Sequence, residues 1–214
     1  LMVAHALNRQ DFDLPFTEKF PQTEFFWLVL LLIAPIITMR TFAHEKSTGT
    51  FETLMTTPVK DSQVVLAKFT GSYLFFLIAF LPTLSYPFIL EHYAHLPPKV
   101  DVRAVLSTGL GVALMGAFFM ALGCFASSLT RSQIVAAVLT FAMATSLFIA
   151  GYLAAVRPSE MNWWHQVFQH ISMLNHMRDF ATGIVDTRPI VFYLSLTGVF
   201  LFLTLKTVES RHWK

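Results

Sequence analysis

The chain has 214 residues, of which 55% are hydrophobic and only 13% are charged, against about 25% charged in an average soluble domain. This composition argues against an ordinary soluble globule. The net charge of +2 and the lack of any basic block exclude nucleic acid as an expected partner.

Five long apolar runs without a charged residue make up about half of the chain. They are 25–39, 69–90, 104–130, 132–156 and 189–205. A helix needs about 20 apolar residues to cross a hydrocarbon core of about 30 Å. The middle three runs are long enough, and the outer two suffice if flanking side chains reach to the membrane surface. The sequence therefore predicts an all-α, polytopic membrane protein: one transmembrane domain over 1–214 with five spans in the lipid bilayer.

The residues present in the spans and the motifs in the chain also limit the kinds of transport and catalysis to expect. None of the spans contains Asp, Glu, Lys, Arg or His, which disfavours a carrier coupled to protons or sodium. The chain has no G-x-x-x-x-G-K-[ST] phosphate loop and no catalytic pair inside a span, so we expect neither an ATP site of its own nor an enzyme. The single cysteine, Cys124, is expected to pack inside a span.

Lys and Arg in the loops set the expected orientation, because cytoplasmic loops are enriched in them. Their density is roughly doubled in the 40–68 loop, at position 131 and after 205 compared with 1–24, 91–103 and 157–188. We therefore expect the 40–68 loop and the C-terminus inside, and the segments 1–24 and 157–188 outside. A polar start on the outside needs a preceding span. We expect the numbered chain to begin part-way through a six-span protein, the alternative being that residues 1–7 are the stub of that span.

The loop at 40–61 mixes charged and apolar residues. Phe51, Leu54 and Met55 share one face of a short predicted helix that Pro58 ends. Capping hydroxyls are offered by Ser47, Thr48 and Thr50. Such a helix would either present an apolar ridge to a partner subunit or fold back on the membrane surface.

Small residues follow one another at steps of four in two of the runs. In 104–130 they are Gly109, Ala113, Ala117 and Ala121, with Gly116 and Gly123 widening the same face; in 132–156 they are Ala136, Thr140 and Ala144. Small residues let helix backbones approach closely in lipid. We favour packing within one subunit, with a translocation path or a dimer seam as the alternative.

The outer loop 157–188 holds the segment 161–180, which is rich in Asn, Gln, Ser and His. Its apolar residues recur at helical spacing: Trp164, Val167, Phe168, Ile171 and Leu174. We read an amphipathic helix at the outer membrane surface, with a partly re-entrant element as the alternative. Five histidines lie on this side without a carboxylate- or Cys-rich set beside them, so no metal site is expected; they are His92, His95, His165, His170 and His176.

Three motifs carry a family resemblance. The loop after the first apolar run resembles that of ABC-2 type transporter permeases: a glutamate, Gly-Thr, Glu-x-Leu and Pro-Val. The matching positions are Glu45, Gly49-Thr50, Glu52 with Leu54, and Pro58-Val59, followed by Lys68. The segment 127–137 and the C-terminal block 175–214 resemble the branch known as gliding-motility-associated permeases. In that block the matching residues are His176, Asp179-Phe180, Gly183, Asp186, Glu209-Ser210-Arg211 and Trp213.

The resemblance implies a six-span permease in the bacterial cytoplasmic (inner) membrane, of which this chain lacks the first span. It implies a homo- or heterodimer of permease chains, each docking one cytoplasmic ABC ATPase that holds ATP and Mg²⁺, with no cofactor on this chain. The coupling residues would be Glu45, Gly49, Thr50, Phe51, Glu52, Leu54, Met55 and Pro58. The two glutamates would pair with basic residues on the ATPase, and the apolar residues would fill its groove.

Two functions fit this resemblance. The first is export of a hydrophobic, lipid-linked or polymeric cargo, which charge-free spans favour over a small ion. The second is a non-transporting scaffold that transmits ATPase movement to an extracytoplasmic partner protein through 1–24 and 157–188.

Overall fold

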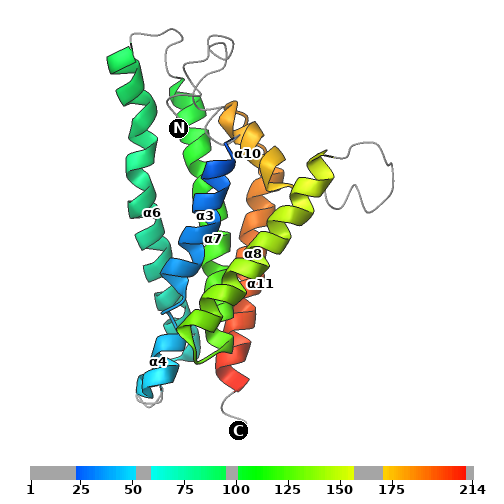
Figure 1. Cartoon of the computed structure of the whole chain (residues 1–214). Coiled ribbons are helices and arrows are strands. Elements are labelled where there is room, and N and C mark those ends of the chain that lie inside the picture. Colours follow the sequence, from blue (N-terminus) through cyan, green and yellow to red (C-terminus); the bar gives the residue numbers. More distant parts are fainter. Residues whose placement is uncertain (1–22, 52–58, 95–100, 157–170, 211–214) are drawn as a thin grey trace.

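The computed structural model describes residues 23–51, 59–94, 101–156 and 171–210. Within these ranges every regular element is a helix (Figure 1). In chain order the helices are α3 (Glu24–Thr38), α4 (Ala43–Thr48), α6 (Asp61–Ala94), α7 (Val102–Leu129), α8 (Gln133–Val156), α10 (Met173–Ala181) and α11 (Thr187–Glu209).

The prediction of five spans is confirmed. Five candidate spans are long and apolar enough to cross a membrane, and each covers one of the predicted runs. The first of them, Phe25–Thr48, takes α3 and α4 together, although the helix is interrupted between Thr38 and Ala43. Helix α6 has 34 residues, which at 1.5 Å per residue is about 50 Å. Its ends therefore extend beyond a hydrocarbon core of about 30 Å.

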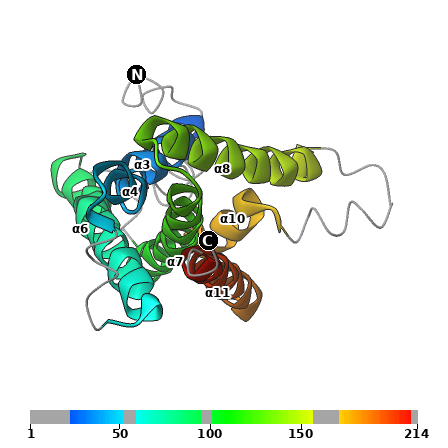
Figure 2. The ribbon, with the colours of Figure 1, turned by 90° about the horizontal axis from the view of Figure 1, so that it is seen from below.

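Helix α7 is the centre of the bundle. Seen from below in Figure 2, the other spans and α10 surround it, and α3, α6, α8, α10 and α11 all contact it. Its apolar window is 72% buried, against 22% in α6 and α8 and 17% in α11. The outward faces of the surrounding helices carry the exposed apolar side chains that a lipid-embedded bundle needs.

The bundle has two distinct ends. One end, here called the α4 end, holds α4, the α7–α8 turn and the last turn of α11 (Figure 1). The opposite end, here called the α10 end, holds α10 and the first turns of α3 and α11 (Figure 1). The described residues of the first motif, such as Glu45 and Gly49, lie at the α4 end with the segment 127–137. The C-terminal motif begins in α10, at the opposite end.

Helix α10 is the described part of the segment 161–180, for which the sequence predicts an amphipathic or partly re-entrant helix. Residues 157–170 lie outside the described part, and a separate short helix follows, capped by Ser172, whose Oγ accepts from Asn175 N at 3.5 Å. The helix ends in a Schellman motif. Gly183 adopts φ 83° there, and Ile184 N donates to Asp179 O at 3.1 Å.

One face of α10 is buried in the bundle. Its buried residues are Met173, Met177, Phe180 and Ala181, whereas Ile171 and Leu174 are only half-buried. The reason lies on α7, where Gly111 leaves a notch: a Cβ there would lie 2.7 Å from the Phe180 ring. Ser107 Oγ also donates to Phe180 O at 2.5 Å. The described part of the segment therefore packs against the central helix α7.

Candidate functional site

The candidate site is the α4 end, where the strongest family motif lies. Helix α4 has no side-chain cap of its own at Phe42, and the first N–H groups of a helix have no intrahelical partner. Ser127, at the end of α7, supplies one: its Oγ accepts from Phe42 N at 3.1 Å and from Ala43 N at 3.0 Å. Ser127 is fully buried. A residue more than 80 positions away thus caps α4 and fixes it to the central span.

The turn after Ser127 makes two further contacts with α4. Lys46 Nζ donates to the carbonyl oxygen of Ser128. The Gln133 amide nitrogen lies 2.9 Å from His44 Nδ1. The motif at 127–137 therefore holds α4 against the end of α7 and the start of α8.

Glu45 pairs inside the chain. Its Oε1 lies 2.5 Å from Lys68 Nζ, near the start of α6, and the same ammonium donates to Thr41 O at 2.6 Å. In this single chain Glu45 therefore has an internal cation as its partner, and its expected pairing with a basic residue of an ATPase stays a prediction. A carboxylate near the end of one span finds a cation near the start of the next, because both are partly withdrawn from water.

Phe51 is also turned inward. It is 1% exposed and belongs to a small apolar cluster with Phe42, Val65, Cys124 and Val208. Its ring meets that of Phe42 edge-on, with the centroids 6.4 Å apart. Burial in its own chain removes the apolar surface of Phe51 from water, and its expected contact with a groove on a partner stays a prediction.

The turn between α4 and Phe51 depends on Gly49. Its φ of 75° lies in the left-handed region, and a Cβ there would meet nothing within 4 Å, so backbone conformation is the reason for glycine. The hydroxyls of Ser47 and Thr48 bond back to the His44 carbonyl at 2.7 and 3.1 Å. They close the end of α4, while most of the predicted helix whose start they were expected to cap lies outside the described residues. The remaining predicted coupling residues, Glu52, Leu54, Met55 and Pro58, lie outside the described residues.

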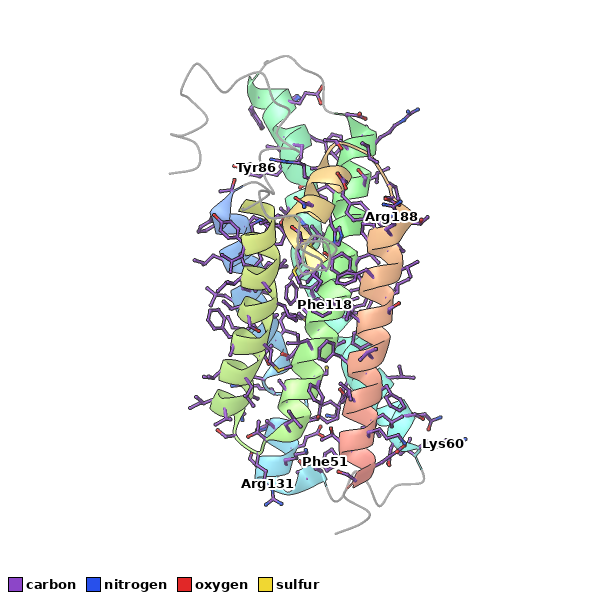
Figure 3. All side chains as sticks on the ribbon, turned by 90° about the vertical axis from the view of Figure 1, so that its right-hand side faces the viewer. Phe51, Lys60, Tyr86, Phe118, Arg131 and Arg188 are labelled. Carbon is purple, nitrogen blue, oxygen red and sulfur yellow. The ribbon has the colours of Figure 1, made fainter. Side chains whose placement is uncertain are left out.

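The exposed described residues of α4 and of the turn after it are polar, apart from Gly49. His44 and the consecutive residues Ser47 to Thr50 are exposed, as are Lys60 and Arg131. Figure 3 shows Lys60 and Arg131 at the same end of the molecule as Phe51. The described surface of α4 therefore offers hydroxyls and an imidazole, next to the exposed apolar side chains of Val59 and Ile134.

The small residues of α7 lie against neighbouring helices of the same chain. A Cβ at Gly116 would overlap the Phe76 ring of α6, and one at Gly109 would lie 3.2 Å from Leu84 of α6. A Cβ at Gly123 would overlap Thr38 at the end of α3. The other members of the set are the half-buried Ala113, whose carbonyl accepts from Tyr73 Oη at 3.2 Å, and the buried Ala117 and Ala121.

The small residues of α8 form one buried line. Ala136, Thr140 and Ala144 are all 0% exposed, and α8 contacts α7 and α3. Thr140 Oγ1 donates to Ala136 O at 2.8 Å, so the hydroxyl adds no unpaired polar group to the contact. Both sets of small residues occupy close crossings between helices of one chain.

Two of the outer histidines fall in described segments. His92 is exposed near the end of α6, and His176 Nδ1 lies 3.2 Å from the Tyr193 hydroxyl of α11. His95, His165 and His170 lie outside the described residues. Within the described ranges no group of three metal-ligating side chains comes together.

Sequence reasoning missed the roles of Ser127 and Lys68. Both stand where a span meets its flanking loop, and both lie in or beside a family motif. The sequence signal for the pair of Lys68 with Glu45 was a cation near the start of one span and a carboxylate in the loop after the previous span. No sequence pattern indicates that Ser127, at the end of α7, caps α4.

Comparison with known protein families identifies the family to which the chain is related. A model of the ABC-2 family transporter proteins matches residues 3–211, nearly the whole chain. The comparisons with curated proteins and with solved structures found no match. With five apolar spans and a family match over almost its entire length, the chain belongs to the ABC-2 transporter family of membrane proteins.

Proposed function

We propose that this chain is the permease subunit of an ATP-driven ABC-2 export system that works with a separate cytoplasmic ATPase. The observation that carries the proposal is the short helix α4, held at one end of the spans by Ser127 of α7 and Lys68 of α6. Family membership supports it. A chain without a phosphate-binding loop needs another subunit to supply the energy.

The attachment of α4 suggests how movement is transmitted. A push on α4 would pass to the central helix through Ser127 and to α6 through Lys68. The exposed Ser47 to Thr50 surface and the segment 52–58 would face the ATPase. Glu52 would pair there with basic residues, and Leu54 and Met55 would supply apolar contact.

The orientation follows from the basic residues. The α4 end carries six described Lys and Arg residues: Arg40, Lys46, Lys60, Lys68, Arg131 and Lys206. Because cytoplasmic ends are enriched in such residues, we place the α4 end and the C-terminus in the cytoplasm of a bacterial cell and the spans in its inner membrane. The motifs at 127–137 and 175–214 support the gliding-motility-associated branch.

The cargo is proposed to be hydrophobic, lipid-linked or polymeric. The five apolar runs hold no ionisable side chain that could bind a small ion. A second permease chain, identical or related, would complete the path. The exposed apolar faces of α6, α8 and α11 leave room for such a chain as well as for lipid.

The test is purification of the full-length protein in mild detergent, followed by identification of co-purifying proteins and measurement of ATP hydrolysis. We expect a P-loop ATPase with the parent protein and its loss in Glu52→Arg and Leu54→Ala. The matched control is Arg188→Ala, an exposed residue near the α10 end, which should retain the ATPase. Absence of an ATPase from the parent preparation would refute the proposal.

A further inference from the structure

The ion pair between Glu45 and Lys68 joins the short helix α4 to a membrane span. Besides its 2.5 Å contact with Glu45 Oε1, Lys68 Nζ donates to Thr41 O in the turn before α4. The ammonium also lies 5.2 Å from the centre of the Phe42 ring, within the range of a cation–π contact. One side chain of α6 thus engages a carboxylate, a carbonyl and an aromatic face around α4.

The pair is partly withdrawn from solvent. The Lys68 side chain is 16% exposed and that of Glu45 is 30% exposed. Nearby cations have other partners: Lys46 donates to Ser128 O, and Lys206 pairs with Glu209 at 2.7 Å. Among the described residues, Lys68 is therefore the cation that holds Glu45.

The Glu45–Lys68 ion pair is not arranged to give the protein the greatest folding stability. Glu45 Oε2 is buried and has no hydrogen-bond partner among the described residues. A partly buried ion pair is often no more stabilising than apolar side chains of the same size, whereas such pairs do fix the relative position of two elements. The arrangement therefore points to positioning.

We propose that Glu45 is a positioning residue that acts through Lys68, so that α4 and α6 move together when the ATPase moves α4. This inference rests on the proposed function. It differs from the expected role of the glutamate, because Glu45 here determines how α4 is tied to the spans and Glu52 is left to contact the ATPase.

The first experiment measures how firmly α4 is held to α6 when no ATPase is present. Spin labels on Ser47→Cys of α4 and Ser85→Cys of α6, both exposed positions, report the distance between the two helices by pulsed EPR in lipid nanodiscs. The native Cys124 is fully buried and is kept. The variants are Glu45→Gln, Lys68→Met and the exchange Glu45→Lys with Lys68→Glu. The control is Glu209→Gln, which removes an exposed ion pair within α11 at the same end.

We expect one narrow distance distribution in the parent and the control, and a broader one in both single variants. The exchange should be narrower than either single variant, although the Thr41 carbonyl loses its donor. Unchanged distributions in the single variants, or an exchange as broad as they are, would overturn the proposal.

The second experiment uses the complex with its ATPase. Labels on Ser85→Cys of α6 and Ser195→Cys of α11, both exposed, should show a distance shift on addition of ATP that Glu45→Gln loses while it still retains the ATPase. Loss of the ATPase from Glu45→Gln would make Glu45 a docking residue and overturn the inference. If the parent binds no ATPase, the proposed function fails, and the nanodisc distances still decide whether the pair ties α4 to α6.

Discussion

Replacing Gly116 by alanine should destabilise the bundle more than its size suggests. A Cβ at this position would lie 2.8 Å from Phe76 Cζ and closer to two other ring carbons, whereas carbon atoms prefer about 3.5–4.0 Å. The ring cannot retreat easily, since Phe76 is 2% exposed and stacks on Phe80 with the centroids 6.1 Å apart. Overpacking costs about 1–3 kcal/mol, and we place this site at the upper end.

The helix itself gains from the substitution, because alanine is favoured over glycine in a helix interior by up to about 1 kcal/mol. The net loss for Gly116→Ala is therefore about 2 kcal/mol. Gly71→Ala is the matched control: it lies on α6, and a Cβ there would meet nothing within 4 Å. It should gain up to about 1 kcal/mol, which separates the two variants by about 3 kcal/mol.

The free energies of unfolding can be measured by SDS titration of the protein in mixed micelles, followed by tryptophan fluorescence. Adding Phe76→Leu to Gly116→Ala should recover part of the loss, since the smaller side chain leaves room for the new methyl group. Equal stability of Gly116→Ala and Gly71→Ala would show that α6 and α7 do not cross closely at this point.

Three further outcomes follow from the structure. Ser127→Ala removes the acceptor of two N–H groups at the start of α4 and should cost about 1–3 kcal/mol; hydrogen exchange at Phe42 and Ala43 should become faster, and unchanged exchange would contradict the capping role. Gly183→Ala forces a Cβ into a φ of 83° and should lower unfolding stability by about 1–2 kcal/mol, while a neutral effect would argue against the Schellman motif. Cys124 is 0% exposed and should react with a maleimide only after unfolding in SDS; labelling of the folded protein would show that this end of α7 is open.

The spans could be predicted from the sequence because the membrane leaves few choices. Backbone polar groups in lipid must be satisfied within a helix, so a long apolar run without charge fixes both the element and its approximate ends. The run 132–156, for example, differs from helix α8 by one residue at its start. The small residues were also informative, since steps of four place them on one face before any neighbour is known.

The contacts of α4 could not be predicted, because they join distant parts of the chain. The pattern of Phe51 with Leu54 and Met55 indicates a face, but it does not say whether that face meets a partner or the chain itself. The outcome for Phe51 depends on Val208, more than 150 positions later, which reaches the same cluster from α11. Similarly, the spacing of Ile171 and Leu174 predicts a helical face but does not indicate that α10 begins after Ser172.

Charge near the end of a span explains why the pairing of Glu45 within the chain could not be predicted. Sequence reasoning treats a glutamate in a loop as surrounded by water and therefore as available to a partner. At the start of α6, however, Lys68 is largely shielded by α4 and by the Phe42 ring, so its ammonium needs an acceptor within reach. Glu45 and Thr41 O are the acceptors that the fold provides. In this chain the family glutamate is therefore tied to the lysine near the start of the next span, and contact between the residues beyond Gly49 and another subunit stays a prediction.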